Sequence, residues 1–356
     1  MGINQGLAAV SGDFMIAALL IYSLAVLAFA GDLAFGKPRR ASTAKAATAP
    51  VKEKELATVG GASDSDSSGG SDSGGSGAAP AAPGTPPALP EQRASVLQSM
   101  RDAGRWVQVA VGLSLTGTTA HLVAVVTRGL AAHRTPWGNM YEFVTALTCI
   151  AAIFFLGLMI RYRAWSLGIW VMAAVVLALG LAETVIYTPA GPLVPALQSY
   201  WLSIHVTAMT LATGIFFVAA VVGILFIVAS RHESRISGGK AVEGENGLLA
   251  RIPGSKQLDK LAYRTVVFGF PIWTFGVIAG AIWADEAWGR YWGWDPVETW
   301  AFITWVLYAA YLHARATAGF RRWAHYIQLL GFVSLVVNML VVQVFVTGMH
   351  SYAGLS

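Results

Sequence analysis

Residues 283–298 read W-A-D-E-A-W-G-R-Y-W-G-W-D-P-V-E and lie between two long apolar segments. A bend between two membrane spans needs few residues, and most of them should be polar. This stretch instead holds four tryptophans: Trp283, Trp288, Trp292 and Trp294. Tryptophan is common at membrane interfaces, but an interface alone does not explain rings interleaved with Gly289 and Gly293, which allow close backbone approach. The pattern predicts a broad aromatic surface for a flat, largely apolar ligand such as a porphyrin.

The end of the same stretch predicts where a helix begins. Asp295, Pro296 and Glu298 have the order of an N-cap, a proline at the first helical position and an acid at the third, which is a capping-box pattern. Capping explains both acids. It is also compatible with ligand contact, because a rigid helix start would hold the aromatic stretch in place.

The composition is typical of a membrane protein. Of 356 residues, 55% are hydrophobic and 12% are charged, whereas soluble proteins average roughly 25% charged residues. The single cysteine, Cys149, cannot form an internal disulfide. The sequence has no C-x-x-C motif, which excludes a dithiol oxidoreductase and a c-type cytochrome. The net charge of +5 is expected to report membrane topology and not nucleic-acid binding.

We predict an all-α, polytopic membrane protein with about eight transmembrane helices. Each predicted span has about 20 mainly apolar residues, roughly the length that crosses a 30 Å hydrocarbon core. The spans are residues 14–35, 107–126, 141–160, 165–187, 200–229, 266–283, 299–317 and 324–347. We expect a first transmembrane helix at 1–36, a disordered cytoplasmic linker and lead-in at 37–105, and a seven-helix membrane domain at 106–356. We find no sustained strand pattern and no clear internal repeat.

The distribution of basic residues predicts the orientation of the chain. With the N-terminus outside, the inner segments hold 21 of the 24 Lys and Arg residues. Only Arg128, Arg134 and Arg290 fall outside, which is the asymmetry that the positive-inside rule describes. We therefore expect a cell-membrane protein whose N-terminus and tryptophan-rich stretch are extracytoplasmic and whose linker, residues 37–105, is cytoplasmic.

Three of the seven histidines are candidate iron ligands. His205, near the start of one predicted span, and His350, just past the last span, both lie on the outer side with the tryptophan-rich stretch. Two neutral imidazoles on opposite faces of a porphyrin make its iron six-coordinate. His313 lies about 22 Å down its span, where an ionisable residue is by default a functional candidate. Helix capping, headgroup contact or a hydrogen bond between helices would explain each histidine singly.

The other histidines have weaker assignments. His121 is a second intramembrane histidine, but neighbouring Thr and Ser residues could satisfy it. We expect His133 to be exposed on an outer loop. We expect His232 and His325 to be solvated among basic residues on the inner side.

A second polar and aromatic corner lies on the outer side at residues 138–142, which read G-N-M-Y-E. Alone, this corner predicts only the start of a helix. Glu142 lies one residue inside the predicted span, so it is expected to pair with a cation, either Arg134 or Arg290.

With these residues assembled, the chain resembles the WWD family of haem-handling membrane proteins. More narrowly, it resembles the CcsA/ResC type of System II cytochrome c biogenesis, a type also labelled CcsB. The resemblance rests on residues 288–298 (W-G-R-Y-W-G-W-D-P-V-E), the hallmark motif. It is supported by residues 137–142, 201–206 and 348–352, and it covers roughly residues 105–356.

The resemblance implies a b-type haem, Fe protoporphyrin IX, as the bound cofactor. His205 and His350 would be its axial ligands at the outer face. The other haem-contacting residues would be Trp288, Trp292, Trp294 and Asp295. His313 would hold the iron of haem in transit together with a histidine from a partner, so this chain alone is not expected to complete that site. No catalytic residue is assigned.

The resemblance also implies a function: haem transport and presentation at the extracytoplasmic face, for covalent attachment to the C-x-x-C-H thiols of apocytochrome c. The implied partners are a ResB-type membrane protein, apocytochrome c, a thioredoxin-like reductant and membrane lipid. The chain would be part of a cytochrome c haem lyase or synthase complex, and the resemblance leaves open whether it is itself an enzyme. Three alternatives remain: a System I-like haem-handling WWD protein, a membrane transporter of another solute, and a purely structural membrane subunit.

Overall fold

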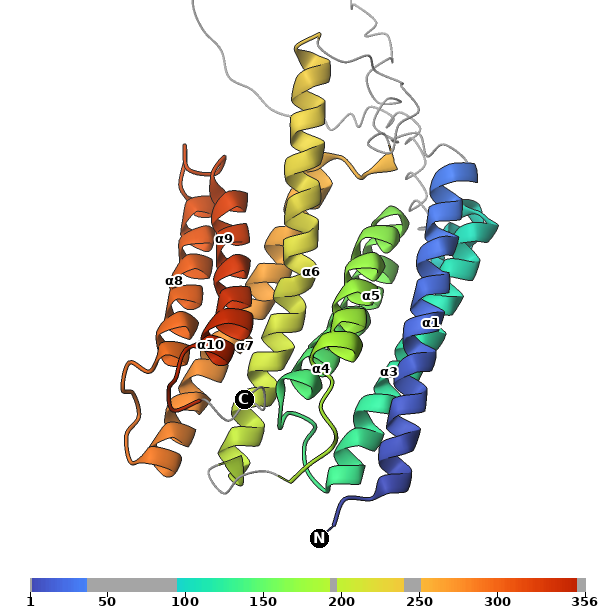
Figure 1. The fold of residues 1–356 in the computed structure, drawn as a ribbon. Helices are drawn as coiled ribbons and strands as arrows, with labels where there is room; N and C mark the ends of the chain where they lie inside the picture. Colours follow the sequence, from blue (N-terminus) through green and yellow to red (C-terminus); the bar gives the residue numbers. More distant parts are fainter. Residues whose placement is uncertain (1, 37–94, 193–196, 240–250, 351–356) are drawn as a thin grey trace, which may run out of the picture. The chain divides into compact units, whose positions relative to one another are not determined.

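The computed structural model describes residues 2–36, 95–192, 197–239 and 251–350. Their helices belong to one unit, formed by Met1–Pro38 and Val96–Ser356. Most of the expected linker, residues 37–105, lies outside the described residues. Every regular element in the described ranges is a helix (Figure 1), as the long apolar spans predict.

The elements follow the predicted order closely. They are α1 (Gln5–Phe35), α2 (Val96–Ala103), α3 (Arg105–Ala132), α4 (Met140–Tyr162), η1 (Trp165–Leu167), α5 (Gly168–Val185), α6 (Tyr200–Ser237), α7 (Ser255–Trp288), α8 (Pro296–Ala316), α9 (Ala324–Val337), the π-helical η4 (Asn338–Val342) and α10 (Gln343–Phe345). Seven segments in the described ranges are long and apolar enough to cross a membrane. The remaining predicted span, residues 299–317, forms α8, which is a helix of 21 residues but is not among the seven, because its tryptophans, tyrosines and polar ends lower its mean hydropathy.

The helices pack against one another in pairs. α1 lies along α3, α6 along α7, and α8 along α9 (Figure 1). Two larger clusters of buried side chains lie in the unit, and α6 and α7 contribute to both. The first cluster also holds residues of α1, α3, α4 and α5, and the second holds residues of α8 and α9. The pair α6 and α7 therefore joins the two halves of the unit.

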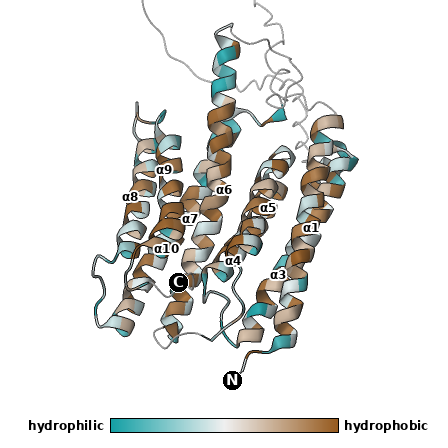
Figure 2. Ribbon diagram, viewed as in Figure 1, coloured by the Kyte–Doolittle hydropathy of each residue, from teal (hydrophilic) through white to brown (hydrophobic). Residues whose placement is uncertain are grey.

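The helices consist mainly of apolar residues along their middle, and hydrophilic residues gather towards their ends (Figure 2). Leu20, Leu27 and Leu177 are each more than 60% exposed. Exposed apolar surface of this extent marks contact with another apolar phase, which for helices of this length is the hydrocarbon core of a membrane.

Several loops meet at the end of the unit where the chain starts (Figure 1). The backbone N–H of Asn4 donates to the Ala131 carbonyl at 3.0 Å, which ties the N-terminus to the end of α3. The Ser199 hydroxyl donates to Glu286 at 2.5 Å, which ties the start of α6 to the end of α7. The tryptophan-rich stretch therefore shares this end with the loops before α4 and α6, and we refer to it below as the N-terminal end.

The prediction that His325 is solvated is wrong. The side chain of His325 is 1% exposed, with Nε2 2.8 Å from Asp259 Oδ1 and Nδ1 2.9 Å from Gln328 Oε1. The basic residues that precede it indicate a nearby surface, but the first turn of α9 directs this side chain inward, onto the ring of Phe226. His133 is exposed, as predicted.

Candidate functional site

A pocket lies at the N-terminal end, between the loop before α4 and the helices α6, α7, α8 and α9. The empty space of the pocket and its open mouth together is about 1240 Å³, a volume that includes solvent in front of the wall. Its wall is mainly aromatic and apolar. The lining includes four tryptophans and two histidines: Trp137, Trp283, Trp288, Trp292, His205 and His350.

His205 lies in the second turn of α6 and is fixed against α7. Its Nδ1 is 2.7 Å from the carbonyl oxygen of Gly276, so this nitrogen carries the proton and donates. Its ring stacks on Trp283, with centroids 6.0 Å apart and planes 11° apart. A Cβ on Gly280 would lie 2.6 Å from the imidazole, so the approach of the ring to α7 requires glycine there. The Nε2 atom, which has no hydrogen-bond partner among the described residues, is left as a lone-pair donor.

His350 is fixed in the same way from the other side of the pocket. Its Nδ1 lies 2.9 Å from Asp295 Oδ2, and the adjacent Met349 N–H donates to Asp295 Oδ1 at 2.6 Å. A Cβ on Gly348 would lie 2.5 Å from Asp295, so this close approach also depends on glycine. As for His205, no described residue hydrogen-bonds to Nε2 of His350.

Asp295 therefore has two structural roles. It is the N-cap of α8, where its Oδ2 accepts from the Val297 N–H at 3.1 Å within a complete capping box, which confirms the predicted helix start. It also orients His350. Burial by itself would raise the pKa of Asp295, but the hydrogen bonds from His350 and Met349 outweigh burial and lower the pKa below its ordinary value.

The two candidate axial ligands meet the same aromatic residue. Trp283 contacts His205 on one side and lies edge-on to His350, with centroids 5.7 Å apart. Trp288 also lies edge-on to His350, at 5.0 Å. Both histidines thus line one pocket at one end of the unit, each with Nδ1 engaged.

Only part of the tryptophan-rich stretch, residues 283–298, forms a loop, because its first residues belong to α7. α7 continues through Trp288 and ends at Gly289, whose φ of 70° is left-handed. Trp288 and Trp292 line the pocket. Trp294 does not line it, because a left-handed φ of 57° turns the chain there and leaves the side chain 67% exposed, edge-on to Trp292.

Glu298 holds this loop in place. Its Oε2 accepts from the backbone N–H of Gly293 at 2.9 Å and of Asp295 at 3.1 Å. Arg290 lies 3.4 Å from Oε1. The predicted partner choice for Glu142 is thereby settled, since Arg290 pairs with Glu298 and Glu142 pairs with Arg134 at 2.6 Å.

The two intramembrane histidines lie outside the pocket. His313 is in the last turn of α8 with its side chain exposed. His121 is fully buried on α3, with Nδ1 3.5 Å from the Tyr22 hydroxyl of α1. The hydroxyl that meets His121 is therefore that of Tyr22 and not that of a neighbouring Thr or Ser residue, which was the expectation.

Sequence reasoning missed two polar contributors to the pocket wall. Trp137, which entered the sequence analysis only as part of residues 137–142 and without a role of its own, lines the pocket, and its buried Nε1 has no hydrogen-bond partner in the described residues. Asn338 is 6% exposed at the start of the π-helical turn η4, and its Oδ1 is likewise unpartnered. A π-helical turn often marks a functional site, but nothing in the sequence near Asn338 indicates one.

Comparison with known proteins places the chain in a family. The family model described as cytochrome C assembly protein matches residues 137–350. The cytochrome c biogenesis protein CcsA of Guillardia theta is 34% identical over 269 residues, covering 70% of this chain and 86% of that protein. CcsA of Gloeobacter violaceus is 32% identical over 307 residues, covering 72% and 88%.

A solved structure has a similar fold. The cytochrome c haem lyase CcmF matches with a TM-score of 0.50 and 19% identity over 68% of this chain. This chain spans 43% of that protein, so the likeness concerns the fold alone. From the family model and the CcsA relatives, the chain belongs to the cytochrome c assembly protein family, as a CcsA-type, multi-pass membrane protein of c-type cytochrome maturation.

Proposed function

We propose that this chain binds haem between His205 and His350 at the extracytoplasmic face of the membrane and presents it for covalent attachment to apocytochrome c. One observation carries the proposal. In both histidines Nδ1 is engaged by a fixed acceptor, the Gly276 carbonyl at 2.7 Å and the Asp295 carboxylate at 2.9 Å. Histidines that ligate a metal almost always donate their other N–H in this way, which fixes the ring and raises the basicity of the ligating nitrogen.

The ligand set suits haem better than a bare metal ion. Within the described ranges, no cluster of three or more His, Cys, Asp or Glu residues could hold a metal. Two imidazoles alone would leave most metal ions short of ligands. Haem iron brings four nitrogen ligands of its own and needs only two axial ones.

The wall of the pocket supports the same ligand. Trp283, Trp288 and Trp292 place aromatic rings beside the two imidazoles, and a porphyrin is flat and mainly apolar. Trp294 lies outside the lining, so we propose that it faces the docking partner or the interface and not the haem plane.

The chain's own residues would bind the haem, orient it and exclude water from it. His205 and His350 supply the axial nitrogens, Asp295 aims His350, and the indoles cover the ring. The bond-forming chemistry belongs to the haem vinyl groups and the two thiols of the acceptor. Positioning the two reactants is therefore the protein's main contribution.

The membrane setting and the partners complete the proposal. We place the N-terminal end on the outer side of the cell membrane, because only three of the 24 Lys and Arg residues lie at that end and each of these three forms an ion pair. We expect a ResB-type membrane partner, apocytochrome c and a thioredoxin-like reductant. A histidine of the partner would complete the transit site of His313.

An absorption spectrum of the purified protein tests the proposal. We expect a Soret band and the low-spin spectrum of bis-histidine haem in the wild type, and loss of haem or a five-coordinate spectrum in His205→Ala and His350→Ala. His133→Asn is the matched control, because His133 is exposed with a left-handed φ of 53°, which Asn tolerates. Wild-type spectra in both alanine variants would refute the proposed ligands.

A further inference from the structure

Two helix starts beside the pocket are built on one plan. Residues 134–142 read R-T-P-W-G-N-M-Y-E, and residues 290–298 read R-Y-W-G-W-D-P-V-E. In both nine-residue segments the first residue is Arg, the sixth is an Asn or Asp N-cap, and the ninth is a Glu at the third helical position. We call them the first corner (134–142) and the second corner (290–298).

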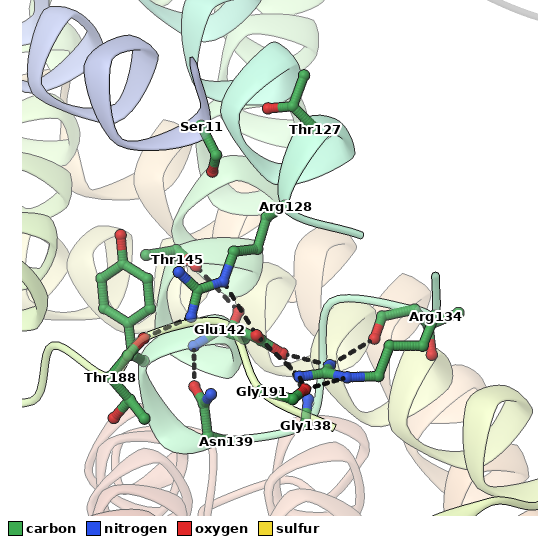
Figure 3. Close-up of polar contacts among 12 residues, drawn as sticks. Ser11, Thr127, Arg128, Arg134, Gly138, Asn139, Glu142, Thr145, Thr188 and Gly191 are labelled. Carbon is green, nitrogen blue, oxygen red and sulfur yellow. Dashed lines mark hydrogen bonds and ion pairs between the residues drawn. The ribbon is translucent and has the colours of Figure 1, made fainter. Parts of the chain in front are cut away.

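The first corner is held by a buried carboxylate (Figure 3). Glu142 is 1% exposed. It accepts from Arg134 at 2.6 Å, from Arg128 at 3.0 Å and from the backbone N–H of Gly138 at 2.7 Å. Its own N–H donates to Asn139 Oδ1 at 2.9 Å. The loop before α4 is therefore fixed to the helix that it precedes.

The second corner repeats these contacts. Glu298 accepts from Arg290 and from the backbone N–H of Gly293. In each corner the arginine covers the glycine closely, since a Cβ would lie 2.5 Å from Arg134 at Gly138 and 1.6 Å from Arg290 at Gly293. Both corners border the same pocket. The shared plan indicates that the first corner, like the second, presents its tryptophan to a ligand.

The tryptophan of the first corner has a hydrogen-bond donor without an acceptor. Trp137 lines the pocket, and its Nε1 is buried and unpaired within the described residues. Buried polar groups almost always have a partner. Glu142 fixes the backbone next to this indole, since it accepts from the N–H of Gly138. A bound ligand that offers an acceptor would satisfy the indole N–H.

The charge near Trp137 favours an anionic acceptor. Arg128 and Arg134 share the single carboxylate of Glu142. The next acid, Glu183, accepts from the Tyr141 hydroxyl at 2.7 Å. The carboxylate of a ligand would therefore meet a corner with two cations on one anion, and hydrogen bonds to an ionised acceptor are stronger than neutral ones.

We propose that Trp137 donates its indole N–H to a carboxylate on the edge of the planar ligand, so that the first corner sets the rotation of that ligand about the axis between His205 and His350. This inference rests on the proposed function, in which the ligand is haem. Haem carries its two carboxylates on one edge of the ring, so holding that edge would place the opposite, vinyl-bearing part of the ring in a defined direction.

The test compares haem with its dimethyl ester, in which both carboxylates are blocked. The proteins are the full-length wild type, Trp137→Phe, and Trp323→Phe as the matched control, because Trp323 is 52% exposed and lies outside the pocket. We expect the wild type and the control to bind haem about tenfold or more tighter than the ester, the worth of one hydrogen bond to a charged group. Trp137→Phe should bind both ligands equally.

The outcomes separate this inference from the proposed function. All three proteins could show bis-histidine spectra while Trp137→Phe keeps the preference for haem over the ester, or while the wild type lacks that preference. Either result would overturn the role of Trp137 and leave the axial ligands in place. Failure of the wild type to bind either ligand would overturn the proposed function and this inference with it. Trp137 Nε1 has no hydrogen-bond partner among the described residues, so Trp137→Phe should not lower the melting temperature of the ligand-free protein. A lower melting temperature would indicate a purely structural role for the N–H.

Discussion

Replacement of Gly280 by alanine should displace His205 without changing any polar residue. Gly280 lies on α7, beneath the imidazole that is hydrogen-bonded to Gly276, one turn earlier. An alanine Cβ would be 2.6 Å from both Cε1 and Nδ1 of His205, well inside van der Waals contact. Both atoms belong to a ring packed on Trp283, so the ring must move away from α7 and lose its bond to Gly276.

The magnitude follows from three terms of known size. Forcing an extra methyl into a packed site costs about 1–3 kcal/mol, and the lost hydrogen bond adds about 0.5–1.5 kcal/mol. Alanine in a helix regains roughly 0.5–1 kcal/mol over glycine. The Gly280→Ala protein should therefore be destabilised by about 0.5–4 kcal/mol, and its haem should lose one axial ligand.

The assay is haem titration followed by absorbance, together with thermal unfolding in detergent. Gly180→Ala on α5 is the matched control, because a Cβ there meets nothing within 4 Å. It should leave the spectrum unchanged and stabilise the protein slightly. If Gly280→Ala bound haem with the wild-type spectrum and affinity, His205 would not depend on its place against α7, and the assignment of its Nε2 to iron would lose its basis.

Three further predictions concern the charged groups. Glu142→Gln should lower the unfolding free energy by about 3–5 kcal/mol, because it leaves two buried arginines without their carboxylate; thermal unfolding should show no comparable loss for the exposed Glu286→Gln. Asp295 has a lowered pKa, so its stabilisation is full above about pH 4 and is lost as the pH falls further; the melting temperature of the wild type should fall more steeply below that pH than that of Asp295→Asn. Asp259→Ala removes the acceptor of His325 and should cost about 1–3 kcal/mol, read from chemical unfolding, and an unchanged midpoint would contradict the observed contact.

The helices were predictable because their signals are local. The starts of α6 and α8 agree with the predicted spans to within a few residues, since Ser199 and Asp295 cap them as their residue types predict. The start of α7 was not predictable from apolar length. The helix begins at Ser255, eleven residues before the predicted span, because its first turns are polar and are held by Glu233 at the other end of α6.

The similarity of the two corners is present in the sequence but obscured by its aromatic residues. The Trp-Gly pairs fall at positions four and five of the first corner and at positions three and four of the second. Aligning the tryptophans therefore separates the arginines, the caps and the glutamates, which are the residues that make equivalent contacts. Only the hydrogen bonds of Glu142 and Glu298 identify the correct register.

His313 has fewer supporting contacts from this chain than the two pocket histidines, His205 and His350. It lies seventeen residues after Pro296, about 26 Å along α8 from the helix start that faces the pocket. His205 and His350 each have a second contact that aims the ring and an aromatic wall beside it. The exposed His313 has neither among the described residues, so it could contribute one ligand but could not enclose a ligand. An iron held there would need its other axial ligand and its cover from another surface, which is why we expect the transit site to form only at a contact with a partner, whereas the pocket can load haem in the isolated protein.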